Sequence, residues 1–374
     1  MSVLNTAAGK VTAAPYGVAV SPDGSRVYVT NQFSNLDCGP GCVSAIDTAT
    51  EMVIATFTVG NGPAGVAITP DGGQVSVTNQ FSNDNNVSTV SIINTRTNEV
   101  KEIDIPSPGF PSNPLGVAVS PDGLKVYVGD GLGTVSVMNT ASNTVDARLT
   151  LNIGNIPIKG VTVSQDGRYV YVVNGSLIQS SQTVPVQMTN SVSKIGINPD
   201  GTLTLIATIP VGDSPLGVAV SPDGGKIYVA NTKGKETPNG VAVGTVSVID
   251  TTTETVTATI AVGNNSSPSG SSGVAFSTDG SKSYAANTLS NSVSEIDPAT
   301  NTVTATIPVG NSPVAFGVFI QPRFAGTPGG KLSRPERLGA GAAIRRSQCR
   351  DGSARLSKGA STAKGNHDVL RRIG

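Results

Sequence analysis

The sequence predicts an all-β protein built from repeated four-stranded units, and three observations support this class. The segment PYGVAVSPDGSRVYVTN at 15–31 recurs five more times. Each copy places an Asp-Gly pair between alternating apolar residues, which is the strongest short-range signal for a β-hairpin. A second module such as VSVIDTTTETVTATIAVG at 246–263 follows the hairpin. The other copies of the hairpin segment lie at 63–79, 114–130, 158–174, 215–231 and 271–287.

In chain order, each unit predicts two strands around the Asp-Gly turn and two more around a turn of the type IDTAT. Four antiparallel strands repeated six or seven times are typical of a β-propeller. Residues 2–12 align with the third and fourth strands of a unit, and residues 312–322 align with a first strand. We therefore expect a seven-bladed β-propeller over 1–322, its last blade closed by both termini. That blade has no recognisable second strand, because the sequence starts about one strand too late; the strand is either missing or supplied by a longer native chain.

The composition agrees with a turn-rich β-fold, because the 374 residues include 44 Gly, 24 Pro and no Trp. No run of about twenty apolar residues predicts a membrane span. Residues 323–374 show no strand alternation and contain 12 basic and 3 acidic residues, so the neutral total combines an acidic domain with a basic tail. We expect this tail to be disordered or an out-of-frame extension; an arm that binds nucleic acid or an envelope polymer is the alternative.

The lengths of the predicted connections indicate where a ligand binds. The hairpin turn keeps its length, whereas the connections from second to third strand contain 11, 10, 4, 17, 14 and 5 residues in successive units. Alternate connections of a blade lie on the same face, and insertions often mark the binding face of a repeat protein. We expect ligand contact on the face formed by residues 32–42, 80–89, 175–191 and 232–245.

Two sets of side chains on this face are candidate ligand contacts. Phe33 and Phe81, beside Asn35 and Asn83, could stack on a sugar, or they could simply plug the loop bases. A polar residue also ends each predicted second strand. This ring could hold Ca²⁺ or a hydroxylated ligand, or it could serve turn geometry alone. Its members are Asn31, Asn79, Asp130, Asn174, Asn231 and Asn287.

Cysteine and histidine usage limits the chemistry that the chain can perform. Cys38 and Cys42 lie in one loop, where a disulfide would indicate an oxidising compartment; free thiols are the alternative. The single histidine of the sequence is His367, in the basic tail. The predicted propeller therefore offers no imidazole base, and we expect no catalytic residue, no organic cofactor and no enzymatic activity.

The segments GVAVSPDGSRVYVTN and GVAVSPDGGKIYVAN, each followed by VSVIDT-type and TVTATIPVG-type segments, closely resemble the YVTN family of β-propeller repeats. The resemblance covers about residues 2–322 and implies an exported, cell-envelope or extracellular protein. No signal peptide precedes the first repeat, which suggests a truncated start. Lactonase-like and streptogramin-lyase-like enzymes share the architecture, and residues 192–209 resemble the lactonase style of turn. No catalytic residue of either group can be placed here.

These observations predict a non-enzymatic binding or scaffold protein of the cell envelope. Its expected partner is an envelope glycan, a polymer or a protein; binding of nucleic acid is disfavoured, and we expect a monomer. One alternative is a lactonase-like hydrolase with a carboxylate-bound metal in the central channel. The other is polymer or nucleic-acid binding through the basic tail.

Overall fold

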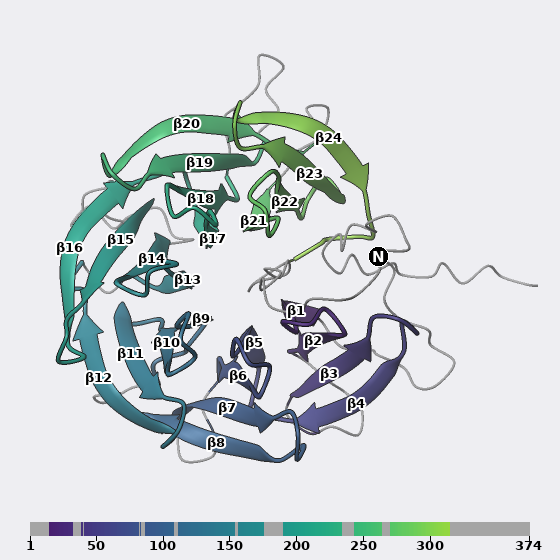
Figure 1. The fold of residues 1–374 in the computed structure, drawn as a ribbon, viewed down its shortest axis with the longest axis vertical. Coiled ribbons are helices and arrows are strands. Elements are labelled where there is room, and N and C mark those ends of the chain that lie inside the picture. The colour runs from purple at the N-terminus through teal and green to yellow at the C-terminus, as the bar shows by residue number, and fades with distance from the viewer. Residues whose placement is uncertain are drawn as a thin grey trace, which may run out of the picture.

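The computed structural model describes residues 15–32, 39, 41–81, 83, 87–107, 111–153, 156–175, 190–233, 243–263 and 270–314. Within these residues the chain forms six antiparallel sheets of four strands each. Figure 1 shows the sheets as blades around a ring, with the first strand of each blade nearest the centre and the fourth outermost. The prediction of an all-β propeller is confirmed.

Each blade is one continuous stretch of chain. Blades one to three comprise β1 (Pro15–Val20), β2 (Arg26–Asn31), β3 (Cys42–Asp47), β4 (Val53–Thr58), β5 (Pro63–Ile68), β6 (Gln74–Asn79), β7 (Ser88–Asn94), β8 (Val100–Ile105), β9 (Gly116–Val119), β10 (Lys125–Gly129), β11 (Thr134–Asn139) and β12 (Thr144–Thr150). Blades four to six comprise β13 (Ile158–Val163), β14 (Tyr169–Gly175), β15 (Asn190–Ile197), β16 (Leu203–Pro210), β17 (Pro215–Val220), β18 (Lys226–Asn231), β19 (Thr245–Asp250), β20 (Thr255–Ala261), β21 (Ser271–Phe276), β22 (Ser283–Asn287), β23 (Ser292–Asp297) and β24 (Thr302–Pro308).

The prediction of a seventh blade closed by both termini is wrong. The described chain forms six four-stranded sheets, and none of them takes a strand from a distant segment. Each sheet begins with one of the six copies of the hairpin segment. The number of blades follows the number of hairpins, because a hairpin supplies the two inner strands on which the outer two are added. Residues 2–12, 315–322 and the basic tail at 323–374 lie outside the described residues.

The hairpin turn is stabilised by its own side chains. In the first blade, Asp23 Oδ1 accepts hydrogen bonds from Ser21 Oγ at 2.6 Å and from the backbone N–H of Ser25 at 3.0 Å. Ser21 Oγ in turn accepts the N–H of Arg26 at 2.9 Å. Gly24 follows with a φ of 71°, a conformation that glycine adopts without steric penalty. In the other five hairpins too, a Ser or Thr hydroxyl donates to the Asp carboxylate two residues later. This hydrogen bond explains why the tetrapeptide Ser/Thr-X-Asp-Gly repeats.

A glycine in each first strand allows neighbouring blades to approach closely. A Cβ atom added at Gly17 would overlap the carbonyl oxygen of Ala64 in the next blade. That carbonyl accepts a hydrogen bond from Thr30 Oγ1 at 2.8 Å, and Thr30 Oγ1 also accepts the N–H of Gly17 at 2.7 Å. The glycine of the repeated Gly-Val pair is thus required by packing between blades, and not by a turn.

The hydrophobic core lies largely between the blades. One cluster combines Tyr28 of the first blade with Val77 of the second, and another combines Val29 of the first blade with Tyr284 of the last. Each fully buried side chain of this size stabilises the fold by roughly 1.5–3 kcal/mol. The fourth strands are the most exposed and alternate between exposed and half-buried residues, as β24 shows. In the described part of the chain, no helix is long and apolar enough to cross a membrane.

Candidate functional site

The two faces of the ring differ in their connections. The face that carries the turns between first and second strands and between third and fourth strands is called the hairpin face. The opposite face, which carries the connections from second to third strand and from each blade to the next, is called the variable face. On the hairpin face, Asp47 Oδ1 accepts the N–H groups of Ala49 and Thr50 at 3.1 and 2.7 Å. Five of the turns between third and fourth strands contain a residue with positive φ just before the fourth strand. These residues are Glu51, Asn98, Asn143, Glu254 and Asn301.

Packing between neighbouring hairpins holds the hairpin face together. A Cβ atom at Gly123 would lie only 3.2 Å from Pro70 Cδ of the preceding blade. The proline of one hairpin therefore sits directly on the glycine of the next. The same contact joins Pro22 to Gly72, Pro121 to Gly167 and Pro222 to Gly280. These contacts join four of the six pairs of neighbouring hairpins; no neighbour lies within 4 Å of a Cβ atom added at Gly24 or Gly224. Because most of these turns pack against a neighbour, insertions are better tolerated on the variable face.

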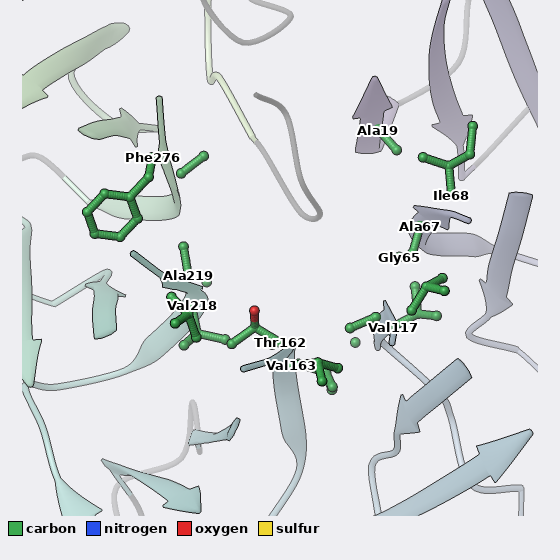
Figure 2. Close-up of a pocket in the computed structure, with 18 of the residues that line it drawn as sticks. Ala19, Gly65, Ala67, Ile68, Val117, Thr162, Val163, Val218, Ala219 and Phe276 are labelled. Carbon is green, nitrogen blue, oxygen red and sulfur yellow. The ribbon is translucent and has the colours of Figure 1, made fainter. Parts of the chain in front are cut away.

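The first strands surround a central cavity of about 290 Å³. Each first strand pairs with only one neighbour in its sheet, so its second edge is left to line the centre of the ring. Figure 2 shows Ile68, Val117, Thr162, Val218 and Phe276, from five different blades, arranged around this space. The described residues that line it include no carboxylate, histidine or cysteine. Across the described chain, no three such groups lie close enough to hold a metal ion.

One ionisable side chain lines this cavity among the described residues, and the sequence analysis missed it. Lys159 is half-buried. It lies near the start of β13, where this strand meets the variable face. Burial lowers the pKa of its ammonium group, and within the described chain its Nζ makes no hydrogen bond or ion pair. The corresponding residues of the other hairpin segments are Tyr16, Ala64, Leu115, Leu216 and Ser272. A lysine at a position otherwise free of charge was the available signal.

The predicted ring of polar residues lies inside the blades. The five asparagines are at most 1% exposed, and none has a positive φ. Asn79 shows the shared geometry, because its Nδ2 donates to Thr89 Oγ1 and Ser91 Oγ of the third strand at 2.8 and 2.9 Å. In all five, the amide oxygen is buried without a hydrogen-bond partner. These side chains therefore join the second strand to the third, and a role in ligand binding stays a prediction.

Asp130 takes the place of asparagine in the third blade. Its Oδ1 accepts the N–H groups of Leu132 and Thr134, both at 2.9 Å, which closes the short turn between β10 and β11. Arg148 Nη2 lies 4.0 Å from the other carboxylate oxygen. Burial outweighs these favourable contacts and raises the pKa of Asp130. In this blade Ser136 Oγ is left without a hydrogen-bond partner, whereas its counterparts accept an asparagine Nδ2.

The predicted aromatic and amide contacts are partly described. Phe81 is 38% exposed on the variable face, and its ring packs directly against Gly62 in the link between the first two blades. Asn83 Oδ1 accepts the N–H of Val87 at 3.0 Å and so closes its own loop. Gln32 Nε2 donates to Gln80 Oε1 of the next blade at 2.6 Å, a contact that sequence reasoning missed. Phe33 and Asn35 lie outside the described residues.

Cys42, at the start of β3, is buried and takes part in a disulfide bond. Its predicted partner, Cys38, lies outside the described residues, so this pairing stays a prediction.

Comparison with known proteins supports the fold and no more. No protein-family model matches the chain, and no curated protein matches it either. Among solved structures, Kuenenia stuttgartiensis hydrazine synthase is similar with a TM-score of 0.66 and 20% sequence identity, over 83% of this chain and 92% of that one. A protein of unknown function from Desulfotomaculum acetoxidans is similar with a TM-score of 0.61 and 17% identity, over 84% of this chain and 91% of that one. The resemblance to YVTN repeats is thus not confirmed by a family match, and the chain is shown to be a β-propeller.

Proposed function

We propose that this β-propeller is a non-enzymatic binding protein of the cell envelope or extracellular space, and that the variable face contacts an envelope glycan or polymer. The observation that carries the proposal is the contrast between the two faces. Packed proline and glycine residues join four pairs of neighbouring turns on the hairpin face. By contrast, the connections from second to third strand on the variable face range from 4 to 17 residues. Binding residues lie disproportionately on loops that a rigid scaffold holds in place.

The described chemistry of the variable face suits a hydroxylated ligand. Phe81 offers a partly exposed ring, and Gln80 directly precedes it after β6. The Gln80 amide accepts a hydrogen bond from buried Gln32, which follows the second strand of the neighbouring blade. A ring beside amide donors and acceptors is a common arrangement for sugar recognition, because the ring covers the apolar sugar face and the amides bind hydroxyl groups. The disulfide at Cys42 favours an oxidising compartment.

The test replaces residues 176–189 by the short turn of the third blade, in which Gly131, Leu132 and Gly133 follow Asp130. Thermal unfolding is measured with a panel of soluble cell-wall polysaccharides. A ligand at a hundredfold excess over its dissociation constant stabilises the native state by about 2.7 kcal/mol. We expect at least one polysaccharide to raise the melting temperature of the full chain and not that of the short-loop variant.

The matched control is Leu124→Ser, which changes an exposed residue on the hairpin face and should keep the full shift. A full chain that responds to no polysaccharide, or a short-loop variant that responds equally, would contradict the proposal. Loss of the response on deleting residues 323–374 alone would instead assign binding to the basic tail.

A further inference from the structure

Among the described residues, the wall of the central cavity is mainly apolar and carries one positive charge. Its described lining consists mainly of valine, alanine, proline and glycine from all six first strands and their turns. A water molecule occupies about 30 Å³ in the liquid, so a cavity of about 290 Å³ corresponds to the volume of roughly ten water molecules. This is the size of a small organic molecule and is close to the lower end of known ligand sites.

The fold does not need the charge of Lys159. Two other blades carry leucine at this position, as Leu115 and Leu216, and their strands have the same place in the ring. Within the described chain no acidic group pairs with Lys159. An ammonium group that is partly removed from water without a partner is costly, and a bound anion would remove this cost.

Lys159 lies at the end of the cavity that is nearest the variable face. Its Cγ is 3.5 Å from the position that a Cβ atom would take at Gly175, the last residue of β14 on the variable face. The rest of the cavity extends from this level to Gln165 and Pro222 at the hairpin face. A ligand with its charged group near Lys159 would therefore place the remainder of the molecule among apolar residues.

We propose that the central cavity binds a small amphiphilic anion, a medium-chain carboxylate, whose head group pairs with Lys159 and whose chain lies between the first strands. The apolar lining accounts for the chain, and Lys159 accounts for the carboxylate. This site is separate from polysaccharide binding by the loops of the variable face, so either proposal can fail without the other.

The experiment measures binding of decanoate and decanol to the full chain by isothermal titration calorimetry, at concentrations below micelle formation. We expect saturable binding of decanoate at a 1:1 ratio. Lys159→Leu, which copies the residue of two other blades, should weaken decanoate binding at least tenfold and leave decanol binding unchanged. Lys159→Arg should keep decanoate binding within a few-fold, because the positive charge is retained.

Two further variants make the result specific. Thr162 is half-buried, and Figure 2 shows its hydroxyl directed into the cavity. Thr162→Phe should therefore block both decanoate and decanol. Lys101→Leu removes an exposed lysine from the outer strand β8 and should change neither. The proposal is overturned if the full chain shows no saturable decanoate binding, or if folded Lys159→Leu binds decanoate as tightly as the parent protein.

Discussion

Replacing Asp130 by asparagine gives the third blade the side chain that the other five blades carry at this position. The new amide oxygen can still accept the N–H groups of Leu132 and Thr134, and the new Nδ2 can donate to Ser136 Oγ, which now lacks a partner. One additional buried hydrogen bond is worth about 1 kcal/mol. Removing the buried negative charge adds to this gain, because the raised pKa of Asp130 shows that its surroundings disfavour the charged form even with Arg148 nearby.

We therefore expect Asp130→Asn to stabilise the protein by about 1–2 kcal/mol at pH 7, which corresponds to a rise in melting temperature of roughly 2–3 °C for a chain of this size. The electrostatic part of this gain depends on pH. Asp130 has a folded pKa above its unfolded value, so its charge costs stability above the folded pKa, and the cost fades as pH falls. The difference between variant and parent should shrink toward the hydrogen-bond part as pH approaches 3.8.

The assay is thermal unfolding of both proteins, followed by circular dichroism between pH 7 and pH 3.5. Asp130→Ala is the control, since it leaves two backbone N–H groups without their acceptor and should destabilise the protein by about 1–3 kcal/mol. The reasoning is refuted if Asp130→Asn destabilises the protein as much as Asp130→Ala, or if its advantage at pH 7 does not decrease in acid.

Three further predictions concern the repeat itself. Gly65→Ala should destabilise the protein by about 2 kcal/mol or more, because the added methyl group would overlap the carbonyl oxygen of Leu115; thermal unfolding measures it. Asn79→Ala should cost about 2–4 kcal/mol, because two hydroxyl groups of the third strand each lose the hydrogen bond from Asn79 Nδ2 and a cavity is left; chemical denaturation measures it. Asp279 should titrate with a pKa of about 2, mainly because Ser277 Oγ donates to it, and the Ser277→Ala variant should titrate higher; NMR measures both.

Each of these predictions can be contradicted directly. A Gly65→Ala protein with parental stability would show that the blades are not held at the observed spacing. An Asn79→Ala protein with an unchanged denaturation midpoint would show that the buried amides do not stabilise the fold. An Asp279 carboxylate that titrates near 3.8 would show that the hairpin turn is not hydrogen-bonded as described.

Much of the local structure could be predicted from the sequence. The six Asp-Gly turns and the alternating Val, Ile and Thr residues predicted strands close to those observed, such as β17 and β18. This succeeded because the hairpin is stabilised by neighbours in the chain: Asp23 bonds Ser21 and Ser25, and Ser21 bonds Arg26. The prediction of seven blades was wrong, because aligning terminal segments with parts of a repeat does not show that they complete a sheet.

The candidate site was less predictable. The repeated asparagines were predicted to hold a ligand on the variable face or to serve turn geometry, whereas Asn231 is buried and donates to Thr245 and Ser247 across the sheet. Lys159 was overlooked because its neighbours in the chain do not distinguish a surface lysine from one that lines the cavity; only alignment of the six hairpin segments marks it, as the one charged residue at this position. Its environment is supplied by first strands from the other blades.

The sequence by itself determined the strands, the hairpin turns and the contrast between constant and variable connections, because these depend on residues a few positions apart. The tertiary structure decided which polar groups are buried, on which face neighbouring turns pack against one another, and which residues line the cavity. Those properties arise from packing between blades, as when Thr30 donates to the carbonyl oxygen of Ala64, 34 residues away. Such contacts exist only once the blades are arranged in a ring.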